Sequence, residues 1–389
     1  MDIERFKSSP AGDLVPITGK DALGRRYEHF AYVPKPLPKH IELSNRTWST
    51  VAEAGTAVGR LDGEGKRLPN PQRLARPAIR AEAVSTSALE GTYTTLPRVM
   101  QSELSEEEAS SEDREVLDYV RAAESGFALV SQGKPVSLNL IKACHMRLTA
   151  RDPHCPPNEK GELRQRQNFI GPANAPIEDS WFVPPPHGDA LREGLYDWEA
   201  WIHRQDELHV LVRMAVGHYQ FETLHPFIYG NGRIGRLVTV LMLLEEGMLT
   251  VPILNISPYL EKRRKEYQDR LREVSATGDF DPWVAFFAEG VRVQAEAGLE
   301  KTNRLLGYQR DTVQMLRSRG IRGTAVQIAE DLTGYPIITP AWVRDTYDIS
   351  YQSASGALQT LESAGVVSIY RYRSNRIAYI AGEVLEIYG

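Results

Sequence analysis

The stretch HPFIYGNGRIGR, residues 225–236, places one histidine beside an asparagine, two arginines and three glycines. Neutral imidazole, whose ordinary pKa is about 6.5, can accept a proton from a hydroxyl group at neutral pH. Glycines let backbone N–H groups converge on one point, and guanidinium groups offer forked donors to phosphate oxygens. The combination predicts a site where a hydroxyl attacks a nucleotide phosphate.

Helical periodicity on both sides of this stretch indicates how its residues are positioned. His225 is expected where one helix ends, and residues 230–232 in the loop that starts the next helix. A helix start carries positive partial charge and free N–H groups, which suit an anion. Asn231 can donate to a phosphate oxygen, while Arg233 and Arg236 lie on neighbouring faces of the first turn. A polyphosphate bound there would lie close to His225.

Each of these residues also has an ordinary structural explanation. A histidine can simply end a helix, a glycine-rich turn is common, and two arginines at this spacing usually face solvent. The indication of a nucleotide site comes from their joint occurrence.

The stretch resembles the signature of the Fic (Fic/DOC) family, H-x-F-x-[D/E]-[G/A]-N-[G/K]-R-x-x-R. The matching positions are His225, Phe227, Gly230, Asn231, Gly232, Arg233 and Arg236. Other stretches that look like Fic proteins are residues 32–95, 161–171, 182–186, 218–227 and about 252–298. The resemblance covers most of the chain and implies a mainly α fold, a Fic-type helical bundle with a short β-hairpin flap.

The activity that this resemblance implies is transfer of AMP from ATP to a tyrosine, threonine or serine hydroxyl of a protein, possible targets including the chain itself. By position, His225 would be the general base. The anion hole for the α- and β-phosphates would be formed by Gly230, Asn231, Gly232 and Arg233. Arg236 would contact the γ-phosphate and orient it.

The resemblance also implies a flap between Asn168 and Val183 that would hold the backbone of the target protein by strand addition. The flap residues would include Ile170, Gly171 and Phe182. From the residues alone, the apolar runs NFI and WFV, separated by turn formers, are expected to pair as a short hairpin.

Tyr229 stands where the family has the aspartate or glutamate that ligates Mg²⁺. A phenol with a pKa near 10 is a poor ligand for this hard cation. ATP is therefore expected as substrate, Mg²⁺ is weakly supported, and no metal ligand is assigned. Three outcomes stay open: metal held by phosphates and water, another acid in its place, or nucleotide binding without efficient transfer.

The segment PAIRAEAVSTSALEG, residues 77–91, is predicted to be a helix with Gly91 at its C-terminal cap. Thr86 and Glu90 are four residues apart and share one face. Together with Gly91 they match the family's inhibitory motif [S/T]-x-x-x-E-[G/N]. The resemblance implies that Glu90 pairs with Arg236 and keeps the γ-phosphate from this guanidinium. The alternative is an ordinary exposed helix face.

With 389 residues the chain is long enough for two or three domains. We predict an N-terminal region at 1–115 that contains the inhibitory helix, a Fic core at 116–303 and a winged helix-turn-helix at 304–389. Residues 1–70 look irregular apart from a helix that ends near Leu61. The acidic run at 102–115 is expected to be a solvated loop and helix start.

DNA is a second candidate partner, through the C-terminal domain. Residues 350–362 could form a recognition helix, and Arg371, Arg373 and Arg376 could contact phosphates. Residues 301–389 hold ten Lys and Arg against eight Asp and Glu, a weak balance for binding DNA. The alternatives are protein contacts or homodimerisation by this domain, and a weakly active or inactive nucleotide-binding regulator that acts through DNA.

The net charge of -5 argues against attraction of the whole protein to nucleic acid or an anionic membrane. Two cysteines, Cys144 and Cys155, give no disulfide framework, which fits a reducing compartment. The apolar run at 237–244 is far shorter than the ~20 residues that span a bilayer, and the charged start is unlike a signal peptide. We expect a cytoplasmic protein with no membrane partner.

Overall fold

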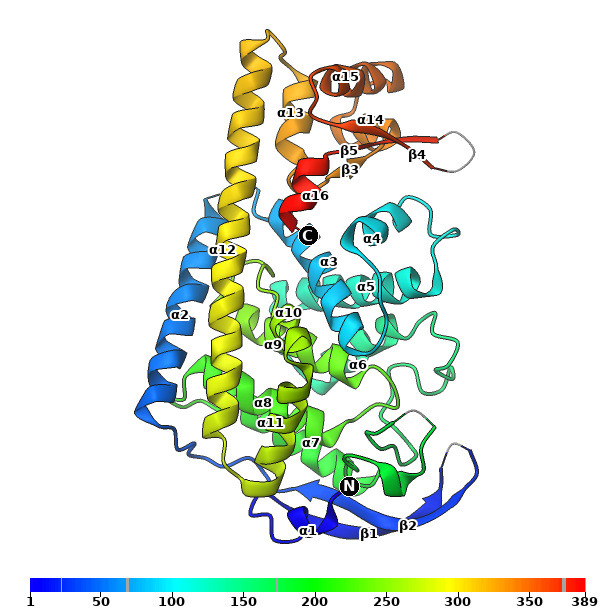
Figure 1. Ribbon diagram of the computed structural model, residues 1–389, viewed down its shortest axis with the longest axis vertical. Helices are drawn as coiled ribbons and strands as arrows, with labels where there is room; N and C mark the ends of the chain where they lie inside the picture. Colours follow the sequence, from blue (N-terminus) through cyan, green and yellow to red (C-terminus); the bar gives the residue numbers. More distant parts are fainter. Residues whose placement is uncertain (22, 68–69, 173, 373–375, 389) are drawn as a thin grey trace.

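The computed structural model describes residues 1–21, 23–67, 70–172, 174–372 and 376–388 (Figure 1). Most of these residues are helical, and the strands form two small sheets, so the predicted mainly α fold is confirmed. Arg373, one of the candidate phosphate contacts, lies outside the described residues. No described helix combines the length and the apolar composition that crossing a membrane requires.

The N-terminal segment is not irregular, so that prediction is wrong. After the short helix α1 (Ile3–Phe6), strands β1 (Gly12–Lys20) and β2 (Arg26–Pro34) form an antiparallel hairpin. The proline at position 16 lacks an N–H group, which indicates a loop in the sequence but is tolerated on the edge strand of a two-stranded hairpin. The prediction was wrong because turn-forming residues such as proline also occur within these strands.

Both faces of this hairpin carry buried residues, which explains why its sequence shows no clean alternation. Ala31 packs with Ile177 and Val183 on one face. Tyr32 packs with Phe6 and Phe182 on the other, the two pairs of ring centroids lying 5.6 and 5.5 Å apart. The hairpin is thus anchored on the segment predicted to be the flap.

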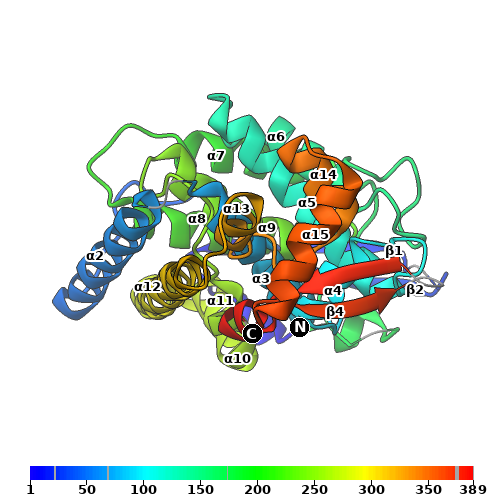
Figure 2. The same ribbon diagram turned by 90° about the horizontal axis from the view of Figure 1, so that it is seen from above.

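Two long helices run side by side along the molecule (Figures 1 and 2). Helix α2 (Asn45–Lys66) begins at Ser44, whose hydroxyl accepts a hydrogen bond from the Thr47 N–H at 3.2 Å. Helix α12 (Asp281–Ser318) is 38 residues long and passes residue 304 without a break. Because its C-terminal part leads into the last elements of the chain, α12 joins them to the helical body.

Shorter helices build the rest of the body. They are α3 (Gln72–Leu89), α4 (Leu96–Ser102), α5 (Ser111–Ser131), α6 (Leu138–Leu148), α7 (Asp189–Ile202), α8 (Val210–Leu224), α9 (Asn231–Glu245), α10 (Ser257–Lys262) and α11 (Arg264–Thr277), with the 3-10 turn η1 (Ile177–Asp179). Nearly every residue of α8 and α9 is buried, as expected for helices that are apolar on all sides. The site is therefore built on the two most central helices.

The C-terminal unit consists of α13 (Thr324–Asp331), β3 (Ile337–Ile338), α14 (Pro340–Tyr347), α15 (Tyr351–Ser363), β4 (Ser368–Tyr372), β5 (Arg376–Ile380) and α16 (Gly382–Tyr388). The helices and the two-stranded ribbon expected from the sequence are present. Strand β3 joins the ribbon at its other edge, giving the antiparallel order β3-β5-β4.

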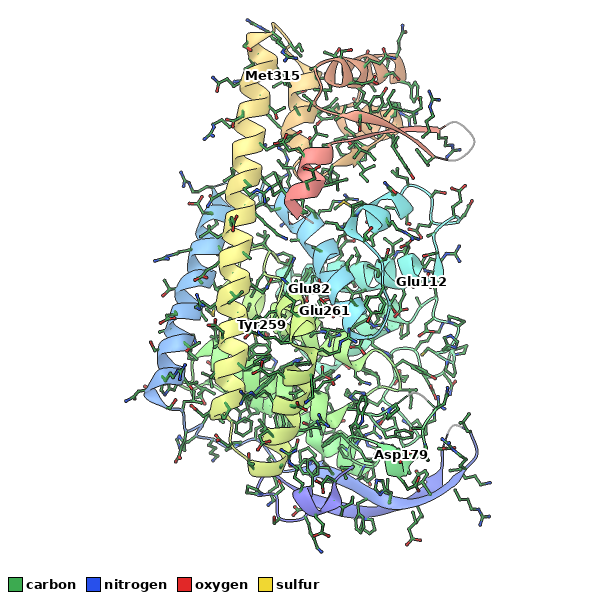
Figure 3. All side chains as sticks on the ribbon, in the orientation of Figure 1. Glu82, Glu112, Asp179, Tyr259, Glu261 and Met315 are labelled. Carbon is green, nitrogen blue, oxygen red and sulfur yellow. The ribbon has the colours of Figure 1, made fainter. Side chains whose placement is uncertain are left out.

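Helix α3, predicted over 77–91, begins five residues earlier and contains Pro77 as an interior residue. It ends as expected, since Gly91 has a φ of 95°, in the left-handed region that favours glycine. Glu82 is buried midway along α3 (Figure 3). Its carboxyl group accepts hydrogen bonds from the hydroxyl and the N–H of Ser257 in α10. Burial raises the pKa of Glu82 to about 7. This contact anchors the middle of α3.

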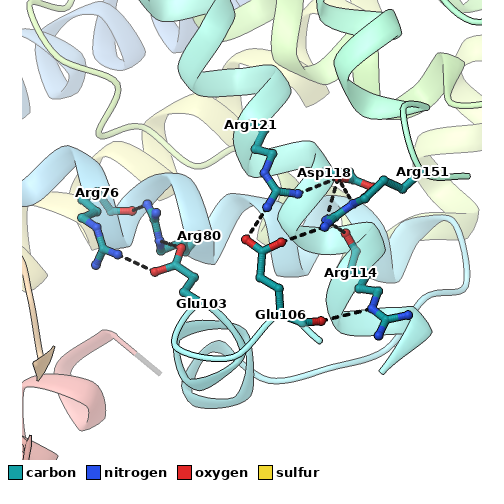
Figure 4. A network of polar contacts seen from close by, with 8 residues as sticks. All are labelled: Arg76, Arg80, Glu103, Glu106, Arg114, Asp118, Arg121 and Arg151. Carbon is teal, nitrogen blue, oxygen red and sulfur yellow. Dashed lines mark hydrogen bonds and ion pairs between the residues drawn. The ribbon is translucent and has the colours of Figure 1, made fainter. Parts of the chain in front are cut away.

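The helix start predicted within the acidic run at 102–115 is present, since α5 begins at Ser111, but the residues before it are not simply a solvated loop. Glu103 pairs with Arg76 and with Arg80 of α3, the latter at 2.6 Å, and Glu106 pairs with Arg121 and Arg151 (Figure 4). The arginines that neutralise these carboxylates come from elsewhere in the chain, so their proximity depends on the fold.

We predict that Tyr32→Ala detaches the hairpin from the flap segment, because removing a buried aromatic ring typically costs about 3–5 kcal/mol. Amide hydrogen exchange should rise sharply over residues 12–34 and 170–183 while α8 and α9 stay protected. Phe30→Ala, on the same strand but 40% exposed, is the matched control and should leave exchange unchanged. Equal effects of both substitutions would contradict the packing described.

Candidate functional site

A hollow lies where α8, α9 and α11 meet the end of α3 and the flap segment. Its walls include His225, Gly232 and Arg236 from the signature, Glu90 from α3, and Ile170 and Phe182 from the flap segment. Glu90 and Arg236, which are 146 positions apart in the chain, therefore face one space. The predicted site residues that line this hollow are Glu90, Ile170, Phe182, His225, Gly232 and Arg236.

His225 ends α8 in a left-handed conformation, with a φ of 49°. Its ring Nδ1 lies 3.2 Å from the carbonyl oxygen of Glu222. Because a carbonyl oxygen only accepts, Nδ1 carries the hydrogen and Nε2 keeps its lone pair. Burial, together with the charge of Arg164, lowers the pKa of His225 to about 4. The ring is thus a neutral base at physiological pH.

Arg164 fixes the chain around His225, a role that sequence reasoning missed. Its Nε donates to the His225 carbonyl at 2.9 Å and its Nη2 to the Pro185 carbonyl at 2.5 Å, while its backbone N–H donates to the Pro226 carbonyl at 2.9 Å. The side chain is 1% exposed, and burial lowers its pKa to about 10. An arginine in a polar loop gives no signal in sequence that it is buried.

Asn231, expected in the loop, is instead the first residue of α9, as Gly232 is the second, and its side chain braces the loop before the helix. Its Oδ1 accepts from the Phe227 N–H and its Nδ2 donates to the Phe227 carbonyl, both at 2.8 Å. One of the two amide N–H groups is thus engaged with the loop, and a contact of the other with a phosphate stays a prediction. The predicted flap residue Asn168 donates to the same Phe227 carbonyl at 2.9 Å, so the flap segment and the loop are tied together.

His145 supports the loop from the opposite side. Its ring stacks on Phe227 with centroids 3.8 Å apart. Its Nδ1 accepts from the Gly161 N–H at 3.0 Å, so Nε2 carries the hydrogen and donates to the Tyr229 carbonyl at 3.0 Å. Burial lowers its pKa to about 4. The sequence pattern around His145 predicts a helix and gives no indication that this side chain supports the loop.

The start of α9 offers its N–H groups to the hollow. Gly230 precedes the helix with a φ of 74°, and no side chain among the described residues caps it. A Cβ at Gly232 would lie 2.3 Å from Glu90 Oε1 and 2.8 Å from Arg236 Nη1, so a larger residue would have to displace the ends of these two side chains. Uncapped first-turn N–H groups and positive partial charge suit an anion.

Arg236 is held by the end of α3, as the inhibitory motif predicts. Its Nε donates to Thr86 Oγ1 at 2.7 Å, and its Nη2 donates to the Thr86 carbonyl at 3.1 Å and to Glu90 Oε1 at 2.6 Å. Burial opposes ionisation of Glu90, but the charge of Arg236 outweighs it and lowers the pKa of the carboxyl. The two groups form a charged pair, which we call the inhibitory contact.

The two partners of this pair differ in exposure. The Arg236 side chain is 3% exposed, whereas that of Glu90 is 36% exposed. An incoming anion could therefore replace the carboxylate without moving the guanidinium.

Arg233 lies on the same helix turn, paired with Glu115 Oε1 at 2.5 Å. Its side chain is buried, and its Nε has no partner in the described part of the chain. Glu115 belongs to the acidic run and was not anticipated as a neighbour of the site.

The two apolar runs of the flap segment pair as predicted, but among the described residues they do so through one β-bridge and not through extended strands. The Ile170 N–H donates to the Phe182 carbonyl at 2.8 Å and the reverse bond measures 3.1 Å. The turn η1 lies between the two residues, and the Val183 carbonyl accepts from the Tyr32 N–H of β2 at 2.9 Å instead of extending the ladder. The N-terminal hairpin thus supports the flap segment.

The residues present do not fit a Mg²⁺ site. The Tyr229 side chain is a phenol, and its carbonyl is engaged by His145. Among the described residues, no group of three or more His, Cys, Asp and Glu side chains could hold a metal ion. Of the carboxylates in the hollow, Glu90 pairs with Arg236, and burial raises the pKa of Glu222 to about 7. Glu90 is therefore not free to bind a cation, and Glu222 is protonated in a large share of the molecules at neutral pH.

We predict that the His225 ring in the free protein titrates near pH 4. Its folded pKa is lowered, so the neutral form persists as pH falls through 6.5 and protonates only near 4. NMR of histidine-labelled protein, with the signal assigned by its loss in His225→Ala, measures this midpoint. A midpoint near 6.5 would show that the ring is neither desolvated nor close to Arg164.

Two family models match the chain. Residues 48–128 match the Fic/DOC family N-terminal model and residues 135–243 match the Fic/DOC family model. The protein adenylyltransferase Fic of Aedes aegypti is 31% identical over 175 residues, which are 44% of this chain and 30% of that protein. The protein of the same name from Drosophila grimshawi is 31% identical over 180 residues, 46% of this chain and 33% of that protein. The chain thus spans about a third of the length of these relatives.

Solved structures show the same fold. A Fic family protein from Desulfovibrio desulfuricans G20 aligns with a TM-score of 0.56 at 19% identity, covering 89% of this chain and 98% of that one. A Fic domain containing signaling protein from Bacteroides thetaiotaomicron aligns with a TM-score of 0.50 at 16% identity, covering 67% and 97%. With its signature, its two matching models and this fold, the chain belongs to the Fic/DOC family.

Proposed function

We propose that this chain is a protein adenylyltransferase that moves AMP from ATP to a tyrosine, threonine or serine hydroxyl of a protein. The observation that carries the proposal is the convergence of His225, the uncapped start of α9 and Arg236 on one hollow. The Fic domain and the names of the relatives support the reaction class.

In the proposed reaction, Nε2 of His225 accepts the proton of the incoming hydroxyl. The hydroxyl oxygen then forms a bond to the α-phosphorus, the bond from this phosphorus to the bridging oxygen breaks, and pyrophosphate leaves. The N–H groups at residues 231–233 and the guanidinium of Arg233 stabilise the negative charge that develops on the phosphates. The Nδ1 contact with Glu222 keeps the ring in the required tautomer.

The inhibitory contact is proposed to keep the enzyme in a resting state. A γ-phosphate would need a hydrogen bond from Nη2 of Arg236, which donates to Glu90 Oε1 at 2.6 Å. The carboxylate of Glu90 would also repel the charge of the phosphate. Thr86 holds Arg236 through Nε independently of Glu90. When Glu90 leaves, the guanidinium therefore remains aimed at the hollow.

The flap segment is proposed to dock the target protein. The bridge between Ile170 and Phe182 presents extended backbone at the rim of the hollow, where an incoming strand can form main-chain hydrogen bonds with little dependence on sequence. We also propose that this reaction takes place in the cytoplasm.

We further propose that the C-terminal domain predicted at 304–389 is a winged helix-turn-helix used for protein contacts, homodimerisation included. The exposed residues that begin α15 are Tyr351, Gln352 and Ser353, without a Lys or Arg side chain. Binding of DNA depends on basic contacts to phosphates, so this helix does not favour a DNA-binding regulator.

We predict that Glu90→Gly, incubated with ATP and Mg²⁺, gains the mass of one AMP or labels other proteins at least about tenfold faster than wild type. The lost charge-assisted hydrogen bond is worth about 1.5–3 kcal/mol, and 1.4 kcal/mol is a factor of ten. Intact-mass spectrometry and labelled ATP measure the two outcomes. Adding His225→Ala to Glu90→Gly should abolish transfer.

Glu53→Gly, at an exposed position of α2, controls for the general cost of a glycine in a helix and should behave as wild type. Absence of AMP transfer by Glu90→Gly to itself or to any protein would refute the proposed activity. Transfer that survives His225→Ala would refute the assigned base.

A further inference from the structure

Helix α3 contacts different parts of the molecule at its two ends. At its C-terminal end, Thr86 and Glu90 make the inhibitory contact. At its N-terminal end, Arg73 and Arg76 contact the C-terminal unit, at the connection from α13 to β3. The helix has 18 residues and is ~27 Å long. It therefore links the C-terminal unit to the hollow directly (Figure 1).

The first contact is an ion pair between Arg73 and Asp331. The two side chains are 22% and 12% exposed, so solvent screens them little. Arg73 Nη1 also donates to the Glu330 carbonyl at 3.4 Å. Asp331 accepts a hydrogen bond from the hydroxyl of Tyr347 in α14, which ties the carboxylate to its own unit. The pair thus joins α3 to an ordered part of the C-terminal unit.

The second contact is a cation–π interaction. The guanidinium of Arg76 lies 4.9 Å from the centroid of the Tyr335 ring, and this ring packs on Trp342 with centroids 4.8 Å apart. Arg76 also pairs with Glu103, which directly follows α4 (Figure 4). The C-terminal unit and the end of α4 therefore contact the same side chain of α3.

Pro77 interrupts the hydrogen bonding of α3 next to these contacts. It has no N–H group, so the Arg73 carbonyl lacks its partner four residues later in the helix. Gly334 packs against this carbonyl: a Cβ there would lie 2.7 Å from the Arg73 carbonyl oxygen, a distance that only glycine allows. The first turn of α3 is therefore packed against the C-terminal unit where its own hydrogen-bond ladder is interrupted.

We propose that Asp331 and Tyr335 are positioning residues for the inhibitory contact. They hold the N-terminal turn of α3, and the continuous helix beyond Pro77 transmits this position past Glu82 to Thr86 and Glu90. Loosening the contacts with Arg73 and Arg76 lets the end of α3 withdraw and frees Arg236 for a phosphate. This inference rests on the proposed function of the hollow.

The test uses the full chain with Asp331→Asn and Tyr335→Ala. Amide hydrogen exchange over residues 84–92 should rise in both variants, and AMP transfer should increase about fivefold, the low end of typical coupling between two sites. Tyr335→Phe keeps the ring and should restore wild-type behaviour. Asp345→Asn, which breaks the exposed pair with Arg344 on the same unit, is the matched control and should change neither quantity.

Arg73→Gln removes the ion pair from the α3 side and leaves every residue of the C-terminal unit in place. It therefore separates loss of the contact from unfolding of that unit, should Tyr335→Ala unfold it. Unchanged exchange over 84–92 in Arg73→Gln and Asp331→Asn would overturn the inference. So would a Tyr335→Phe variant that behaves like Tyr335→Ala.

Glu90→Gly distinguishes this inference from the proposed function. If Glu90→Gly transfers AMP while the Arg73 and Asp331 variants stay at the wild-type rate, positioning by the C-terminal unit is wrong and the transferase proposal stands. If Glu90→Gly transfers nothing, the proposed function fails, and hydrogen exchange over residues 84–92 alone decides whether the C-terminal unit positions α3.

Discussion

A buried guanidinium needs an anion or a hydrogen-bond acceptor as its partner, and the structure of the site depends on meeting this need for Arg236. Leaving a buried charge unpaired costs about 3–5 kcal/mol when one partner of an ion pair is removed. Here the partners are Thr86 and Glu90, supplied by α3. The N-terminal region is thus part of the structure of the site, and a phosphate that replaces Glu90 satisfies the same requirement.

The loop between α8 and α9 is likewise held in place by buried polar groups. Buried polar groups from three directions converge on its backbone: Asn231 from the start of α9, Arg164 from the flap side and His145 from α6. Asn231 bonds to the Phe227 backbone, Arg164 donates to the His225 and Pro185 carbonyls, and His145 donates to the Tyr229 carbonyl and accepts from the Gly161 N–H. Preorganisation of this kind lets fixed dipoles stabilise developing charge without reorganising.

The sequence predicted the parts of the site that lie within one short motif or on one helix face. The residues from His225 to Arg236 and the pair Thr86 and Glu90 depend on local spacing, which a sequence displays. Arg164, His145 and Glu115 were missed because their roles depend on which segments the fold brings together. The N-terminal hairpin was missed because both its faces carry buried residues and a proline lies in its edge strand, which hides the alternation that identifies strands.

The most direct measurement of the central claim compares the affinities of ATP and ADP for His225→Ala with and without Glu90→Gly, by calorimetry. The His225→Ala background prevents turnover. If Glu90 occupies the place of the γ-phosphate on Arg236, removing it should strengthen ATP binding by about tenfold and change ADP binding much less. Equal changes for the two nucleotides, or no change for ATP, would contradict the account.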